Sequence, residues 1–216
     1  GQVLSGGSCI AKARAIKEGG FTCDPSSRSQ CQDQCDGAGN ADSCNSFGEI
    51  LASENDIDGA RERFKKGCEA KKPSLTACAN LAGVILKTDK DAERALSRFK
   101  IACDGGDGLG CYGLGKMMRA DNPQEASEKF SLACDAGFSA GCAAVGENIL
   151  EGLVSWYGSL KAVESDDVEE LNKGIQLVEE GCLGGSERGC FMLGTIYESG
   201  VPGRRASMVE ATALYE

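Results

Sequence analysis

Cysteines are the residues of this 216-residue chain whose number and spacing point most directly to chemistry, and there are 13 of them. Ten fall into five pairs whose members lie eight to ten positions apart: Cys35/Cys44, Cys68/Cys78, Cys103/Cys111, Cys134/Cys142 and Cys182/Cys190. Such thiols form disulfides or bind zinc. Zinc is disfavoured because the Cys-x2-4-Cys knuckle is missing and each pair lies about a repeat from the next. The spacing therefore favours five disulfides.

Three cysteines remain outside these pairs: Cys9, Cys23 and Cys31. We expect one further bridge among them, and the sequence does not choose its members. Because 13 is an odd number, at least one thiol is free or joined to another molecule. A nucleophilic role for a free thiol is disfavoured, since the chain contains no histidine to activate it.

The cysteines also recur with a period, which indicates internal repeats. Cys9 and the second members of the pairs fall at positions 9, 44, 78, 111, 142 and 190. The steps between them are 35, 34, 33, 31 and 48 residues. The last step therefore contains an insertion of about 14 residues relative to the others.

Each repeat contains two segments with helical periodicity. In the first segment, Ala60, Phe64 and Cys68 stand at i, i+4 and i+8, and the segments ending at Cys103 and Cys134 repeat this stripe. In the second segment, an apolar residue three positions after the cysteine precedes Gly or Ala, which lets two helices approach closely. The predicted unit is an antiparallel helix pair. The predicted fold class is all-α, a right-handed α-solenoid of such pairs stapled by intra-repeat disulfides.

We predict a single solenoid over the whole chain. Its parts are a modified N-terminal cap (1–36), regular repeats (37–150), an insertion (151–165), a last full repeat (166–204) and a terminal helix (205–216). Ala211 and Tyr215 occupy the stripe positions of the terminal helix. Either the chain is cut before the cysteine that should follow, or this helix is a cap that hides the last apolar face.

Two segments carry a resemblance to a known family. Residues 102–115 read Ala-Cys-Asp-Gly-Gly-Asp-x-x-Gly-Cys-Tyr-x-Leu-Gly, and residues 133–146 read Ala-Cys-Asp-Ala-Gly-Phe-x-x-Gly-Cys-Ala-x-Val-Gly. This pattern resembles the Sel1-like repeats, which are related to the tetratricopeptide repeat. Its cysteine-bearing form resembles the Helicobacter cysteine-rich proteins and the mitochondrial cytochrome c oxidase assembly factor built of Sel1-like repeats.

The resemblance implies two functions of different classes. The first is a non-catalytic protein-interaction scaffold, a peripheral subunit or assembly factor of a larger complex such as a mitochondrial respiratory complex. The alternative is a secreted or periplasmic β-lactam-binding or hydrolysing protein. The mitochondrial intermembrane space and the bacterial periplasm or exterior all allow disulfides. No cofactor is expected except haem, which the resemblance alone suggests and whose axial ligand here would be Cys or Met.

The charge of the chain limits its partners. The formal net charge is −10, which disfavours nucleic acid because phosphate binding needs clustered Lys and Arg. We expect protein partners with basic patches and salt-sensitive association. The longest apolar run, residues 81–86, is far shorter than the roughly 20 residues that span a bilayer, so no transmembrane segment is expected.

Other motif matches are explained better by the repeats. Residues 108–113 match Gly-x-Gly-x-x-Gly but follow a predicted helix rather than a strand. Ser97 and Lys100 match the Ser-x-x-Lys of penicillin-binding enzymes, but neither Ser-Asp-Asn nor Lys-Thr-Gly occurs. The acidic run at 166–170 is typical of a solvated helix start. No catalytic set is complete, so we expect a protein without enzymatic activity.

The insertion contains the single tryptophan, Trp156, with Tyr157 beside it. These residue types are enriched at binding hot spots, and insertions in repeat proteins map to one face. Both residues are therefore candidate partner contacts. The alternative is that Trp156 packs back onto the neighbouring repeat.

Overall fold

The computed structural model describes residues 2–5, 8–11 and 22–215, with only the backbone described for residues 2–5 and 8–11. The chain divides into two compact units, Gly1–Gly110 and Cys111–Glu216. No helix in the described part of the chain combines the length and the apolar character needed to cross a membrane.

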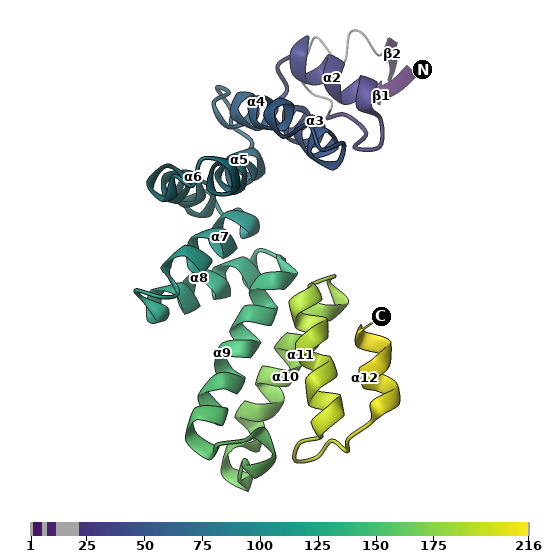
Figure 1. Cartoon of the computed structure of the whole chain (residues 1–216). Coiled ribbons are helices and arrows are strands. Elements are labelled where there is room, and N and C mark those ends of the chain that lie inside the picture. The colour runs from purple at the N-terminus through teal and green to yellow at the C-terminus, as the bar shows by residue number, and fades with distance from the viewer. Residues whose placement is uncertain (1, 6–7, 12–21, 216) are drawn as a thin grey trace. The chain divides into compact units, whose positions relative to one another are not determined.

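The first unit is a row of helices preceded by a two-stranded ribbon (Figure 1). Its elements are β1 (Gln2–Ser5), β2 (Ser8–Ala11), α2 (Arg28–Asp36), α3 (Ala41–Ser53), α4 (Ile57–Cys68), α5 (Leu75–Thr88) and α6 (Ala92–Asp104). The strands pair antiparallel, with Val3 opposite Ile10, and the cysteine period does not predict this ribbon. From α2 to α6, each helix packs against the next one along the chain.

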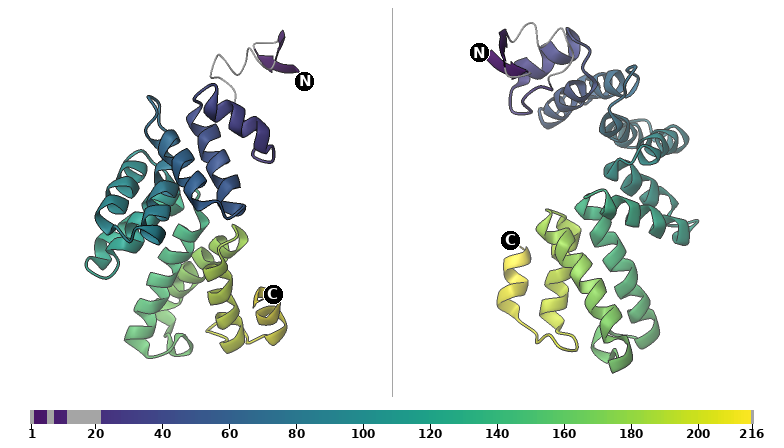
Figure 2. Two further views of the ribbon diagram at one scale, coloured as in Figure 1. Left: turned by 45° about the horizontal axis from the view of Figure 1, so that its top comes forward. Right: turned by 180° about the vertical axis from the view of Figure 1, so that it is seen from behind.

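The second unit repeats this arrangement, and its helices α9 and α10, of 19 and 16 residues, are longer than any helix of the first unit. Its elements are α8 (Pro123–Asp135), α9 (Ser139–Tyr157), the 3-10 turns η1 (Leu160–Ala162) and η2 (Ser165–Asp167), α10 (Val168–Leu183), α11 (Glu187–Ser199) and α12 (Met208–Tyr215). Helix α7 (Gly108–Met118) begins just before the boundary between the units. Figure 2 shows α9 to α12 packed in succession, and α9 also contacts α11. The predicted fold class, a solenoid of paired helices, is confirmed.

The predicted stripes form the core between the helices. Ala60 and Phe64 of α4 are 0% and 3% exposed, and Ala126 and Phe130 of α8 are 0% and 1% exposed. Helix α4 begins where Asp56 accepts a hydrogen bond from the backbone N–H of Gly59, which satisfies one free donor of the first turn. Helices that carry the first cysteine of a pair in their last turn are called first helices, and those that contain the second cysteine are called second helices.

Small residues of the second helices lie directly under rings of the following first helix. A Cβ atom at Gly48 of α3 would lie 2.5 Å from the ring of Phe64, closer than real Cβ atoms approach. A Cβ atom at Gly194 of α11 would likewise collide with the ring of Tyr215 on α12. The recurring glycine is therefore required by close helix packing, and α12 packs as a first helix does.

Residues 151–165, predicted as an insertion, lengthen one helix pair. Residues 151–157 continue α9, which has 19 residues, and the remainder leads through η1 into η2. The added turns place Leu153 and Val163 in a hydrophobic core with α10 and α11. The buried members of this core are Leu150, Leu153, Val163, Leu171, Ile175, Val178, Leu193, Ile196 and Val201.

Candidate functional site

The paired cysteines are bonded across the turns between adjacent helices. The structure forms Cys35–Cys44, Cys68–Cys78, Cys134–Cys142 and Cys182–Cys190, with Cα–Cα distances of 4.4 to 4.6 Å. Cys103 and Cys111 are also disulfide-bonded. Covalent links inside each repeat are therefore part of the fold.

A further bridge closes the segment in front of α2. Cys23 and Cys31 are bonded with a Cα–Cα distance of 4.9 Å, and both side chains are buried. The Cys23 backbone N–H donates a hydrogen bond of 3.0 Å to Ser43 Oγ of α3, which ties this segment to the first full helix pair. Cys9 belongs to β2, but its side chain lies outside the described residues, so the expected unpaired thiol stays a prediction.

One compact group of metal-ligand atoms exists in the described residues. The sulfurs of Cys134 and Cys142 and a carboxylate oxygen of Glu180 lie within 4.8 Å of one another. Both sulfurs belong to one disulfide, so they offer no thiolate to a metal ion. This group is better described as a structural bridge beside an exposed carboxylate.

The two aromatic residues of the insertion have different environments. Trp156 is 82% exposed, so it does not pack back onto the neighbouring repeat. Tyr157 is half-buried and donates a hydrogen bond of 2.5 Å from its hydroxyl to Asp167 Oδ2. This hydrogen bond raises the pKa of Tyr157 to about 12. Tyr157 thus ties the end of α9 to the start of α10, while a partner contact by Trp156 stays a prediction.

The other motif matches lie on ordinary helix surfaces or turns. Ser97 and Lys100 are both exposed on α6. Residues 108–113 form the first turns of α7 rather than a loop after a strand. Glu169 and Glu170 are exposed in the first turn of α10, where carboxylates complement the helix dipole.

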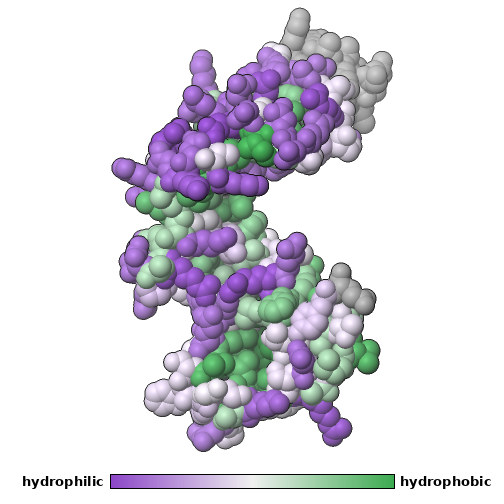
Figure 3. Space-filling view, viewed as in Figure 1, coloured by the Kyte–Doolittle hydropathy of each residue, from purple (hydrophilic) through white to green (hydrophobic). Residues whose placement is uncertain are grey.

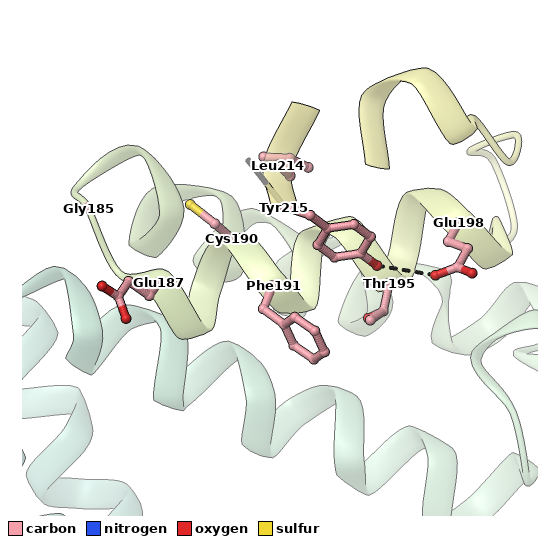
Figure 4. A pocket seen from close by; sticks show the side chains of 8 residues that line it. All are labelled: Gly185, Glu187, Cys190, Phe191, Thr195, Glu198, Leu214 and Tyr215. Carbon is pink, nitrogen blue, oxygen red and sulfur yellow. Dashed lines mark hydrogen bonds between the residues drawn. The ribbon is translucent and has the colours of Figure 1, made fainter. Parts of the chain in front are cut away.

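The most distinctive surface feature is an open hollow of about 910 Å³ between α11 and α12 (Figure 4). We define the α11 face by the side chains of this hollow that come from the two helices: Glu187, Cys190, Phe191, Thr195, Glu198, Leu214 and Tyr215. Its centre is aromatic, and both of its charged groups are acidic. The hollow therefore combines an apolar floor with negative ends.

Two contacts fix Tyr215 at the edge of the α11 face. Its ring packs against Phe191 with the centroids 5.7 Å apart, in a tilted arrangement favourable for aromatic pairs. Its hydroxyl donates a hydrogen bond of 3.2 Å to Glu198 Oε2. Partial burial raises the pKa of Tyr215, and the hydrogen bond to Glu198 adds to this effect. Tyr215 therefore remains a neutral donor at physiological pH.

Phe191 differs from every residue at the equivalent position in the other second helices. The position after the second cysteine holds Asn45, Ala79 and Ala143, which are 8%, 1% and 1% exposed, and Tyr112, which is half-buried. Phe191 is 62% exposed. A position that is covered in the other helix pairs is thus open on α11 and carries a large aromatic side chain.

In the second unit, α11 covers the corresponding face of α9. A Cβ atom at Gly189 of α11 would lie 3.2 Å from Cβ of Ala143. One turn further along α9, Glu147 is 4% exposed and accepts a hydrogen bond of 2.8 Å from Arg188 Nε of α11. An arginine of the covering helix therefore neutralises the carboxylate on the covered face.

In the first unit, the contact between α5 and α3 is made by the amide side chain of Asn80. Asn80 Nδ2 of α5 donates hydrogen bonds of 2.9 Å to Asn45 Oδ1 and 3.1 Å to Glu49 Oε1 of α3. In both α3–α5 and α9–α11, consecutive second helices thus contact each other through polar side chains. No such helix covers α11 within the described residues.

A smaller hydrophobic groove of about 340 Å³ lies on the other side of α11, against α9. Figure 3 shows this hydrophobic surface in the second unit. Its apolar lining is Leu150, Val154, Leu160, Met192 and Ile196. Thr195 borders both hollows, so the exposed side of α11 is a ridge between two apolar depressions.

Comparisons with known proteins support the fold. Neither a sequence-family model nor a curated protein matches the chain. A solved Sel1 repeat protein from Oxalobacter formigenes matches 93% of this chain and 82% of its own at 21% identity, with a TM-score of 0.63. The chain has the Sel1-like repeat fold. The protective antigen c5321 of uropathogenic Escherichia coli, which has the same fold, matches 94% of this chain and 43% of its own, at 19% identity and a TM-score of 0.54.

The α11 face of this Sel1-like solenoid was not predicted from the sequence. The signal was present, because Phe191 follows a second cysteine where Asn45 and Ala79 are small or polar. An aromatic residue there is ambiguous, however: Tyr112 occupies the same position and packs between Phe130 and Phe138, with centroid distances of 5.7 and 5.3 Å. Only the packing distinguishes a core ring from an exposed one.

Proposed function

We propose that the chain is a non-catalytic protein-interaction module that docks a partner on the α11 face. The observation that carries this proposal is the hollow between α11 and α12, in which Phe191 is 62% exposed between the carboxylates of Glu187 and Glu198. Exposed aromatic side chains in a hollow are typical binding hot spots. The acidic ends of the hollow agree with the net charge of −10 and favour a basic partner.

The fold and the composition support an interaction role over catalysis. Solenoids of stacked helix pairs present extended binding surfaces. The chain contains no histidine, the most common general base of enzymes. The Ser97 and Lys100 pair, which suggested the β-lactam alternative, is exposed on a helix surface, so no observation favours that alternative.

More specifically, we propose that the chain is a peripheral subunit or assembly factor of a larger complex. The disulfides fit an oxidising compartment, such as the periplasm, the extracellular space or the mitochondrial intermembrane space. A stable peripheral subunit requires a rigid surface, and the covalent links inside each repeat favour rigidity.

Site-specific photo-cross-linking in the source cells tests this function. A photoreactive phenylalanine replaces Phe191 in one variant and Leu132 in a control variant. Leu132 is 48% exposed on α8 and lies outside the α11 face. We expect a discrete cross-linked partner at position 191 and none at position 132. Identical cross-linking at both positions, or none at either, would overturn the proposal.

A further inference from the structure

The turn between α4 and α5 differs from the other turns between paired helices in its length and its charge. Cys68 and Cys78, which flank it, are 10 positions apart, whereas the cysteines of the other pairs are eight or nine positions apart. The turn contains Lys71 and Lys72, which are both exposed, followed by Pro73. Insertions in repeat proteins map to one face, which is often the binding face.

These two lysines line an open hollow of about 750 Å³ in the first unit. The hollow lies between the turn that precedes α3 and the end of α4, and we call it the lysine hollow. Its charged lining is Asp42, Lys66, Glu69, Lys71 and Lys72. None of the described residues that line it is aromatic.

The hollow arises from a small residue at a junction between two helix pairs. At two other junctions, the residue three positions before the second cysteine contacts the next first helix. A Cβ atom at Gly105 would lie 2.5 Å from Leu75 Cδ1, and Ser139 Oγ donates a hydrogen bond of 2.9 Å to the Gly184 carbonyl oxygen. The equivalent residue of α3 is Ala41, whose methyl group is shorter than leucine and donates no hydrogen bond. Ala41 lines the hollow, so the hollow is a feature of the interior of the repeat stack.

The backbone of the lysine turn is held in place by the protein itself. The Ser74 N–H donates a hydrogen bond of 3.0 Å to the Gly67 carbonyl oxygen, and Ser74 is buried. Pro73 has a fixed backbone angle φ and restricts the backbone of Lys72 before it. A ligand of these lysines therefore has little backbone to order, which favours affinity.

Cations outnumber carboxylates in the ion pairs around the hollow. Lys66 Nζ and Arg63 Nη1 share a single carboxylate, that of Asp36, at 3.2 and 3.3 Å. Glu69 is paired with Arg98 at 2.8 Å. The acidic side chain of Glu69 is thus neutralised, and the group around Asp36 keeps an excess of positive charge.

Lys71 and Lys72 add to this excess, because neither forms an ion pair within the described residues. Asp42 is the one carboxylate of the lining that has no ion pair in the same part of the chain. Residues 61–100 as a whole contain 11 Lys and Arg but five Asp and Glu, although the chain has a net charge of −10. The first unit therefore carries a local positive charge that the net charge conceals.

We propose that the lysine hollow docks an acidic segment of a partner protein, whose Asp or Glu carboxylates pair with Lys66, Lys71 and Lys72. This inference goes beyond the proposed function, because the hollow belongs to the first unit and the α11 face to the second, and the two surfaces select opposite charges. Nucleic acid is disfavoured, because the lining offers no aromatic ring for base stacking and the net charge of the chain repels an extended polyanion.

Two matched peptides test the proposal. Both are about 12 residues long, flexible and fluorescently labelled, and they differ only at about four central positions, which are glutamate in one and glutamine in the other. Binding to the whole chain with its disulfides formed is measured by fluorescence anisotropy at low and at physiological salt. We expect the glutamate peptide to bind at least about tenfold more tightly, with an advantage that falls as salt rises.

Variants of the chain locate the binding. Lys71→Glu with Lys72→Glu should weaken the glutamate peptide about tenfold or more, because carboxylates then face carboxylates. Lys87→Glu with Lys100→Glu is the matched control, since both lysines are exposed in the same unit, lie outside the hollow and change the net charge equally. This control should weaken binding less than about threefold. Circular dichroism checks that each variant retains its helices.

A substitution in the opposite direction gives a second test. Asp42→Asn removes the unpaired carboxylate of the lining and should strengthen the glutamate peptide about twofold or more. Weaker binding by this variant would contradict the proposed docking of carboxylates.

The remaining outcomes are decisive as well. Equal binding of the two peptides, no binding of the glutamate peptide, or equal losses in the two double variants would overturn the proposal while leaving cross-linking at position 191 intact. A single-stranded oligonucleotide of the same length that binds as tightly as the glutamate peptide would show an unselective anion surface and overturn it too. Self-association that is lost in the Lys71 and Lys72 variant would identify a second copy of the chain as the occupant and exclude a separate acidic partner.

Discussion

Glu147 of α9 is bound by Arg188 of α11 through both carboxylate oxygens, although the two residues are 41 positions apart. Arg119 adds a third contact, from Nη1 to Glu147 Oε2 at 3.2 Å. The carboxylate is almost fully buried, while both arginines reach solvent. This cluster links neighbouring second helices through side chains, in addition to the apolar core.

Removal of this carboxylate should destabilise the second unit. We expect Glu147→Ala to lower the free energy of unfolding by about 1–3 kcal/mol, because two guanidinium groups lose a buried partner. Glu151, whose side chain is 61% exposed and which pairs with Arg119, provides the control. Glu151→Ala should cost less than about 0.5 kcal/mol. Urea unfolding followed by circular dichroism measures both values, and equal losses would contradict the importance of burial.

The same carboxylate should produce a pH dependence. Burial alone would raise the pKa of Glu147, but the hydrogen bonds and charges of Arg188 and Arg119 outweigh it and hold the pKa below its usual value of 4.5. Because the pKa is lower in the folded state, the stability from Glu147 is complete above about pH 4.5 and is lost as the pH falls through the folded pKa.

Urea midpoints between about pH 6 and pH 3 measure this dependence. The difference between the wild type and Glu147→Gln should be largest at the upper end of this range and should shrink toward the lower end. A difference that stays constant or grows in acid would show that Glu147 is not held ionised by its arginines.

Two glycines of α3 and α5 should respond oppositely to the same substitution. Gly48→Ala forces a Cβ atom against the Phe64 ring and should cost about 1–3 kcal/mol. Gly83 lies within α5 and has open space around its Cβ position. Gly83→Ala should therefore stabilise the first unit by about 0.5–1 kcal/mol through helix propensity. Thermal unfolding of the two variants should shift in opposite directions, and a shift in the same direction would rule out this packing role.

The disulfides should differ in their resistance to reduction. Cys35 and Cys44 are 0% and 1% exposed, whereas Cys182 and Cys190 are half-buried, and Cys190 lines the hollow of the α11 face. A reductant attacks accessible sulfurs first. Limited reduction followed by alkylation and mass spectrometry should label Cys182 and Cys190 before Cys35 and Cys44. The reverse order would contradict this ranking by exposure.

Trp156 offers an independent test of the interaction role. Since it is 82% exposed, Trp156→Ala should leave the unfolding midpoint unchanged. If Trp156 contacts the partner, a smaller fraction of the variant than of the wild type should migrate with the native complex when a gentle extract is run on a native gel. An unchanged native mass would show that Trp156 does not contribute to the interface.

The fold followed from the sequence because local periodicity and the cysteine spacing agreed. Ala60 and Phe64 are four positions apart, which places them on one face of a helix. The pairing of Cys68 with Cys78 places a turn between two helices. The continuation of α9 to Tyr157 was harder to predict. Residues 151–157 contain no proline that would end the helix. The sequence alone, however, does not show that Leu153 packs into the core with α10.

The candidate site was less predictable, because exposure is a property of packing rather than of residue type. Trp156 and Tyr157 are adjacent aromatic residues, yet Trp156 is exposed whereas the Tyr157 hydroxyl donates a hydrogen bond to Asp167. The contact of Arg188 with Glu147 spans 41 positions and has no counterpart in the repeat pattern. Interactions between neighbouring repeats depend on side-chain geometry that the period does not encode.

The placement of the disulfides has a consequence for how the protein is made. Each of the five bonds described with its partner joins cysteines that are consecutive along the chain, eight to ten positions apart. Short loops close at a low entropic cost, so Cys68, Cys134 and Cys182 each meet their native partner before any other cysteine. Cys31 is an exception, because Cys35 lies four positions away and its partner Cys23 lies eight positions away. The later hairpins can therefore oxidise one by one as the chain is delivered into its compartment, whereas the N-terminal pairs Cys23–Cys31 and Cys35–Cys44 must avoid the local mispairing of Cys31 with Cys35.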